Sequence, residues 1–145
     1  MNMNGKEEYN FLTQTISSRL NKYKYSVEKY VYDEKEFGNY EAIFVIDNIK
    51  IKVTRDKEQI FFEIGSLAEF DEWFDLELVI ESQGGKITIH KKQNTEKQIS
   101  EYIKILDQNF SKIRALFSNK NYFQTKSNLK KMEKARVKSI FGLDV

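Results

Sequence analysis

The chain has 145 residues, a length typical of one domain that can bury a hydrophobic core. Hydrophobic residues make up 40% of it and aromatic residues 14%, which excludes a disordered chain, and the absence of cysteine excludes disulfides and thiolate metal sites. Charged residues make up 32%, yet the net charge is only +2.

That small net charge hides an uneven distribution. Residues 28–84 carry fifteen acidic and six basic side chains, a net charge of −9. Residues 85–145 carry fourteen basic and five acidic side chains, a net charge of +9. Such asymmetry indicates either binding surfaces of opposite sign or two regions that pack together and partly neutralise each other.

The N-terminus is polar and has no apolar stretch of the kind found in secretory signals. The longest apolar run, Ala42 to Ile46, is far too short to cross a bilayer. We therefore expect a cytoplasmic protein that does not bind membranes, a monomer or weak dimer.

An amphipathic helix is predicted over 7–21, where apolar side chains recur at helical spacing. A strand follows over 25–32, and Gly38-Asn39 ends it.

The clearest β pattern lies in the runs 42–47, 49–55 and 59–65. In the second run, apolar residues alternate with Lys50, Lys52 and Thr54, so one face is expected to be buried and the other wet. Because the connections at Asn48 and at 56–58 are short, the strands should be antiparallel neighbours in a meander.

Residues 76–90 fit two structures. The alternation of Leu76, Leu78 and Ile80 suits a hairpin completed by "KITIH", whereas a short helix would begin at Asp75 and end near Gly84. We favour the helix, because acidic residues gather at its start, where the helix dipole stabilises them.

The basic third of the chain is predicted to be helical. "TEKQ" at 95–98 fits a capping box with Thr95 as N-cap and Gln98 as its partner, and one helix of about six turns should run from there to 118–121. A last helix is expected over 127–141. The prediction is therefore a single α+β domain over 1–145, with an N-terminal helix, an antiparallel meander of three to five strands, and C-terminal helices packed on one sheet face.

No pattern in the sequence indicates catalysis, a cofactor or a metal. His90 is the only histidine, too few for a zinc site, and no nucleophile motif accompanies it. Asp71, Glu72 and Asp75 do not have the spacing of a calcium loop, and Gly84-Gly85-Lys86 lacks the rest of a phosphate-binding loop. We expect neither an enzyme nor a cofactor.

Two charged segments suggest binding instead. The first, "EFDEWFDLE" at 69–77, places five carboxylates around Trp73, the only tryptophan. Tryptophan is favoured in binding hot spots, and acids around it steer a basic partner. The second is a basic helical face suited to phosphates, consisting of Lys126, Lys130, Lys131, Lys134, Arg136 and Lys138.

Three segments together resemble small bacterial immunity proteins, the cytoplasmic partners that neutralise polymorphic or contact-dependent toxins. They are "TRDKEQIFFEIG" (54–65), "EWFDLELVIESQGG" (72–85) and "NFSKIRALFS" (109–118), within a match over about 40–118, and "KARVKSIFG" (134–142) agrees in style. The resemblance implies an inhibitor that binds the C-terminal domain of a toxin, frequently a nuclease. It marks Arg55, Asp56, Trp73 and Asp75 as pattern positions.

We therefore expect an immunity-type inhibitor that binds its toxin directly, and nucleic-acid binding through the basic helix is the alternative. The expected partner-binding residues are Glu58, Glu63, Glu69, Asp71, Glu72, Trp73 and Asp75.

Overall fold

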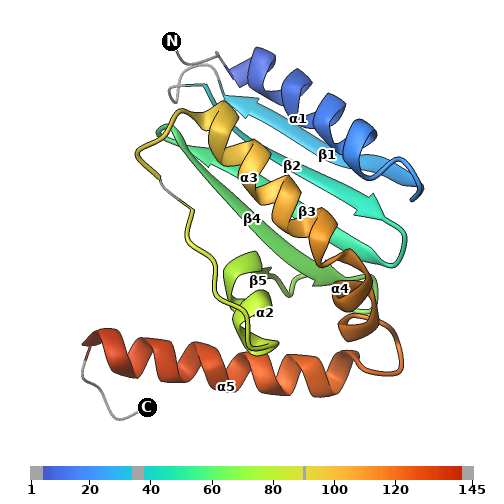
Figure 1. Cartoon of the computed structure of the whole chain (residues 1–145), viewed down its shortest axis with the longest axis vertical. Helices are drawn as coiled ribbons and strands as arrows, with labels where there is room; N and C mark the ends of the chain where they lie inside the picture. Colours follow the sequence, from blue (N-terminus) through green and yellow to red (C-terminus); the bar gives the residue numbers. More distant parts are fainter. Residues whose placement is uncertain (1–4, 34–37, 90, 142–145) are drawn as a thin grey trace.

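The computed structural model describes residues 5–33, 38–89 and 91–141, and its centre is a five-stranded antiparallel sheet with helices packed on it (Figure 1). The elements are α1 (Gly5–Arg19), β1 (Tyr25–Asp33), β2 (Asn39–Ile46), β3 (Ile49–Asp56), β4 (Gln59–Ser66), β5 (Phe74–Asp75), α2 (Leu76–Ser82), α3 (Thr95–Gln108), α4 (Phe110–Leu116) and α5 (Tyr122–Phe141). The predicted α+β class and the order of its parts are confirmed.

The sheet is a meander, since its spatial order β1-β2-β3-β4-β5 is also the chain order. Short connections allow only this antiparallel neighbour pairing. Between β3 and β4, Lys57 and Glu58 form a two-residue turn with φ of 50° and 67°. Two left-handed residues are typical of the type I′ turn, whose twist matches that of the flanking strands.

One face of the sheet forms the core. Along β2, Tyr40, Ala42, Phe44 and Ile46 are buried, and their neighbours in the sequence are only partly so. The helices α1 and α3 lie side by side across this face (Figure 1). The expectation that helices cover one sheet face is confirmed.

A buried carboxylate ties the two helices to the sheet. Glu8 of α1 is fully buried and accepts hydrogen bonds from Tyr40 Oη (3.1 Å), Arg55 Nε (3.1 Å) and Thr95 Oγ1 (2.6 Å). Burial raises the pKa of Glu8, and its three partners oppose that rise. Arg55, one of the positions marked by the resemblance, therefore has a structural role inside the protein.

The helix predicted after residue 75 is confirmed as α2. At its end, Gly84 has φ of 84°, and the amides of Gly84 and Gly85 donate to the carbonyls of Glu81 and Ile80. This is the Schellman arrangement, which needs a left-handed residue that glycine adopts freely. Asp75 stands at the N-cap position, but its side chain makes no capping hydrogen bond.

Two details of the basic third were predicted wrongly. Asn94, not Thr95, is the N-cap of α3, because the Thr95 hydroxyl is used by Glu8 and the Gln98 side chain by the backbone amide of Ile60. The single long helix is also broken at Asn109, whose side-chain amide donates to the Ile105 carbonyl at 2.8 Å.

The last helix begins at Tyr122, earlier than the predicted start at Ser127. It lies beyond the β5 edge of the sheet and packs against α2 (Figure 1). Its buried residues are Tyr122, Thr125 and Leu129. His90 lies outside the described residues. None of the described helices has the length and apolar character needed to cross a membrane.

Candidate protein-binding surface

The sheet face opposite α1 and α3, here called the open face, carries a groove of about 530 Å³. Ile43, Val45, Lys50 and Lys52 line it from the middle strands. The segment 67–73 between β4 and β5, here called the aromatic loop, contributes Leu67, Phe70, Asp71 and Trp73, and β1 with the start of β2 contributes Glu28, Lys29 and Glu41.

The aromatic loop is fixed to the sheet by one lysine. Lys50 is only 8% exposed, and its ammonium donates to the carbonyls of Glu69 and Phe70, both at 2.8 Å. Burial lowers the pKa of Lys50, although nearby Asp71 opposes that shift. Since a buried ammonium needs such partners, Lys50 holds the loop in one conformation.

The close approach of the loop depends on Gly65. A Cβ atom added there would lie 2.8 Å from the Glu72 carbonyl oxygen and 3.3 Å from the Trp73 ring. Both distances are shorter than ordinary van der Waals contact. Glycine at this point of β4 therefore allows the loop to lie flat on the sheet.

The indole of Trp73 turns toward lysines rather than toward the surrounding carboxylates. The ammonium groups of Lys50 and Lys52 each lie 4.6 Å from the ring centroid, within the range of cation–π attraction, and the ring is partly buried. The exposed apolar surface of the loop comes instead from Phe70, which is 86% exposed, and Leu67, which is 56% exposed.

Three of the predicted partner-binding acids are bound to α5. Glu69 pairs with Lys126 at 2.7 Å, Glu72 with Lys130 at 3.0 Å, and Asp75 with Arg136 at 3.3 Å. We call this row of contacts the ion-pair seam; it also includes Glu81, which lies 3.5 Å from Arg136. The acidic middle and the basic end of the sequence thus neutralise each other in part.

The pKa values along the seam follow from these contacts. The hydrogen bond from Lys126 lowers the pKa of Glu69, and the hydrogen bond to Glu72 raises the pKa of Lys130. Asp75 differs, because burial and the neighbouring charge of Glu77 raise its pKa more than Arg136 lowers it. The charge of Glu69 is therefore better compensated than the charge of Asp75.

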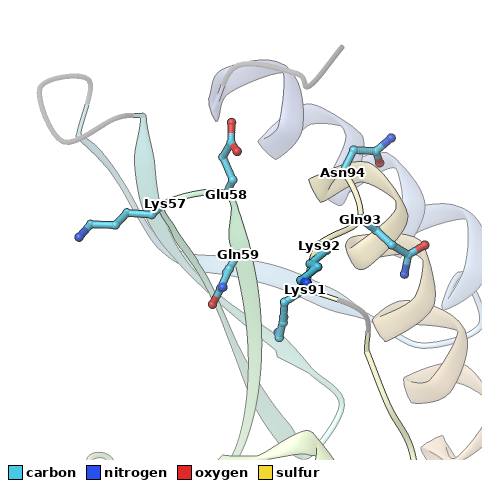
Figure 2. A pocket seen from close by; sticks show the side chains of 7 residues that line it. All are labelled: Lys57, Glu58, Gln59, Lys91, Lys92, Gln93 and Asn94. Atoms are coloured by element: carbon cyan, nitrogen blue, oxygen red, sulfur yellow. The ribbon is translucent and has the colours of Figure 1, made fainter.

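Two predicted acids lie elsewhere. Glu63 stands on the open face of β4 between Lys52 of β3 and Asp75 of β5, and burial together with Asp75 raises its pKa. Glu58 lies in the β3–β4 turn, beside a shallow polar hollow that also contains Lys91 and Asn94 (Figure 2). Only Asp71 and Trp73 of the predicted set line the groove.

The basic side chains predicted on α5 fall into two groups, those in the ion-pair seam and those outside it. Lys126, Lys130 and Arg136 take part in the seam, whereas Lys131 and Lys134 are exposed. Lys138 is also exposed. The six side chains therefore do not form one uniform surface for phosphates.

Four residues that line the groove were not predicted from the sequence as candidate binding residues: Ile43, Val45, Leu67 and Phe70. The run "AIFVI" at 42–46 contained a usable signal, because five apolar residues in one strand make both of its faces apolar. No comparable signal marked Phe70 as exposed, since its position depends on how Lys50 holds the loop.

The described residues contain no cluster of three His, Cys, Asp or Glu side chains that could hold a metal ion. Comparisons with protein-family models, with curated proteins and with solved structures found no match to this chain.

Proposed function

We propose that this protein is an inhibitor of the bacterial immunity type, which neutralises a toxin domain in the cytoplasm by binding it directly. The observation that carries the proposal is the aromatic loop. It exposes Phe70 and Leu67 to solvent, and buried contacts at its base hold its conformation.

A loop of this kind suits tight protein binding for two reasons. Large apolar side chains at a surface gain free energy when a partner covers them, and such patches mark interaction sites. A loop that is already ordered also loses little conformational entropy when it binds. The hydrogen bonds of Lys50 to the Glu69 and Phe70 carbonyls and the Glu69–Lys126 ion pair supply that order.

The test is co-expression with the toxin domain encoded immediately upstream of the gene for this chain. We expect the wild-type chain to restore growth and to elute with the purified toxin domain as one complex in gel filtration. A toxin domain from an unrelated system serves as the control and should be neither bound nor neutralised.

The absence of such a toxin gene would contradict the proposal. So would a toxin domain that kills cells despite abundant folded inhibitor and elutes separately from it. Binding of duplex DNA by the wild-type chain at physiological salt, without toxin binding, would support the nucleic-acid alternative instead.

A further inference from the structure

We propose that the open-face groove is the docking site for the partner, and that it accepts an apolar side chain flanked by lysine or arginine. This inference rests on the proposed function and specifies its chemistry. It differs from the sequence-based prediction, because most of the predicted acids lie outside the groove.

Apolar side chains line the groove from two sides. Ile43 and Val45 of β2 lie on the sheet side beside Lys50 and Lys52, and Trp73, Phe70 and Leu67 come from the aromatic loop. Phe70 and Leu67 are the most exposed of these five apolar residues. An apolar side chain placed between the sheet and the loop would cover part of this apolar surface.

The three lysines of the groove already contact other groups of this chain. Lys29 pairs with Glu41 at 2.9 Å, Lys50 donates to two loop carbonyls, and Lys52 lies over the Trp73 ring. Each therefore has a partner from this chain, and none needs an anion from outside.

Two carboxylates at the rim of the groove differ from these lysines. Glu28, at the bulge of β1, and Asp71, in the aromatic loop, are both exposed. Neither forms an ion pair with any residue that the structure describes. Both carboxylates act on the charge of Lys50, but that ammonium is buried and bonded to two loop carbonyls, so the charge that these two residues present to solvent is negative. Exposed negative charges beside an apolar groove attract a cationic group and repel an anionic one.

The main test measures association kinetics between the toxin domain and variants of the full chain. Phe70→Ser should raise Kd at least about 10-fold, mainly through faster dissociation, because it removes an apolar anchor. Glu28→Lys with Asp71→Lys should slow association and weaken its dependence on salt, as expected for rim charges. Glu72 is left unchanged because it pairs with Lys130.

Two matched controls show whether the effect is specific to the groove. Phe123→Ser removes a phenylalanine that is 66% exposed at the start of α5. Glu96→Lys with Glu101→Lys reverses two acids of α3, which covers the sheet face opposite the groove. Both controls should bind the toxin domain as the wild type does.

A second measurement does not depend on the toxin. Trp73 is the only tryptophan, so its fluorescence reports on the groove directly. We expect a short peptide of alternating leucine and arginine to shift the emission below about 1 mM, the range of weak binding. The same peptide with glutamate in place of arginine should not, and Glu28→Lys with Asp71→Lys should abolish the preference.

The outcomes separate the two proposals. Wild-type neutralisation that survives both groove variants would overturn the groove while leaving the inhibitor function standing. Failure of the wild type to bind the toxin, together with a basic-peptide preference, would overturn the function and leave the groove standing. If both peptides shifted the Trp73 emission equally, or if neither shifted it, the proposed chemistry of the groove would be overturned.

Discussion

At the scale of single residues, the buried ion pair of Glu8 and Arg55 joins parts of the fold that lie far apart in the sequence. It connects α1 to β3, and Tyr40 and Thr95 extend the connection to β2 and α3. A charge inside a protein is tolerated only when its partners compensate for lost hydration. The pKa of Glu8 is nonetheless raised, so burial outweighs that compensation.

We predict that Arg55→Met lowers the free energy of unfolding by about 3–5 kcal/mol at neutral pH, because it leaves a buried carboxylate without its cation. A carboxyl group whose folded pKa is raised contributes stability below its unfolded pKa, and loses it as pH rises through the folded pKa. The loss in the variant should therefore be smaller at about pH 4, where Glu8 takes up a proton. Urea unfolding at the two pH values measures both effects.

Tyr40→Phe is the matched control for this prediction. It removes a neutral hydrogen-bond donor from Glu8 and should cost about 1 kcal/mol, with little change in the burial of the ring. If Arg55→Met lowered the free energy of unfolding equally at both pH values, packing rather than charge would explain its effect.

Gly65 gives a second prediction at this scale. Gly65→Ala should cost about 1–3 kcal/mol, because the added methyl group overlaps the Glu72 carbonyl and presses on the Trp73 ring. Thermal unfolding measures the loss, and Trp73 fluorescence should shift because the ring must move. Thr54→Ala, on the neighbouring strand, should change neither property by a comparable amount. A folded, unshifted variant would contradict the proposed packing.

Trp73 also shows what the sequence could and could not predict about the site. The pattern drew attention to the segment 69–77, part of which lines the groove, but it placed the indole among carboxylates. The lysines that contact the ring come from β3, far away in the chain. Their positions follow from strand register, which local composition does not contain.

At the scale of elements, the turn of the β3–β4 hairpin has a backbone conformation that costs free energy. Both of its turn residues, Lys57 and Glu58, have left-handed backbones, a conformation that glycine adopts without the penalty imposed by a Cβ atom. The carbonyl of Glu58 accepts a hydrogen bond from the buried side chain of Gln98 at 3.0 Å, which helps to hold the turn.

We predict that Glu58→Gly raises the free energy of unfolding by roughly 0.5–1 kcal/mol, because glycine removes a left-handed penalty of about 1–2 kcal/mol and costs about 0.5–1 kcal/mol in chain entropy. Gln59→Gly, one residue later in the strand, should lower it by about 0.5–1 kcal/mol. Chemical denaturation of the two variants checks the difference in sign. A loss of stability in Glu58→Gly would mean that its side chain contributes more than its backbone strain costs.

The helices were predicted well where the spacing of apolar residues determines the structure. They were predicted poorly where contacts with distant residues determine where a helix begins or ends. The apolar spacing from Ile99 to Phe117 continues through Asn109, so the break between α3 and α4 has no signature in the pattern. The capping box failed for a similar reason, since Thr95 and Gln98 bind Glu8 and Ile60 instead. A side chain that binds a distant residue instead of capping its own helix can be recognised only when the positions of both elements are known.

At the scale of the whole molecule, the ion-pair seam explains the charge asymmetry of the sequence. The net charges of −9 and +9 belong to regions that meet where α5 lies beside the aromatic loop and α2. Tyr122 and Leu129 are buried in the first half of α5, where Lys126 and Lys130 also belong to the seam. Arg136 continues the seam farther along the helix.

We predict that the seam makes stability depend on salt. Partly exposed ion pairs contribute about 0.2–1 kcal/mol each, and salt screens them. Raising sodium chloride from about 0.02 M to about 0.5 M should therefore lower the free energy of unfolding by about 1 kcal/mol. Guanidinium is itself a salt, so urea is the denaturant to use.

The variant Glu69→Gln with Glu72→Gln should be less stable at low salt and nearly insensitive to added salt, because two seam pairs lose their charge. Lys131→Glu with Lys134→Glu, on exposed positions of the same helix, changes charge outside the seam and should retain the salt response of the wild type. If salt changed the free energy of unfolding of both variants by the same amount, long-range net charge would explain the salt dependence of stability. In that case the contacts of Lys126 and Lys130 would be incidental, and α5 would be held by its apolar side chains alone.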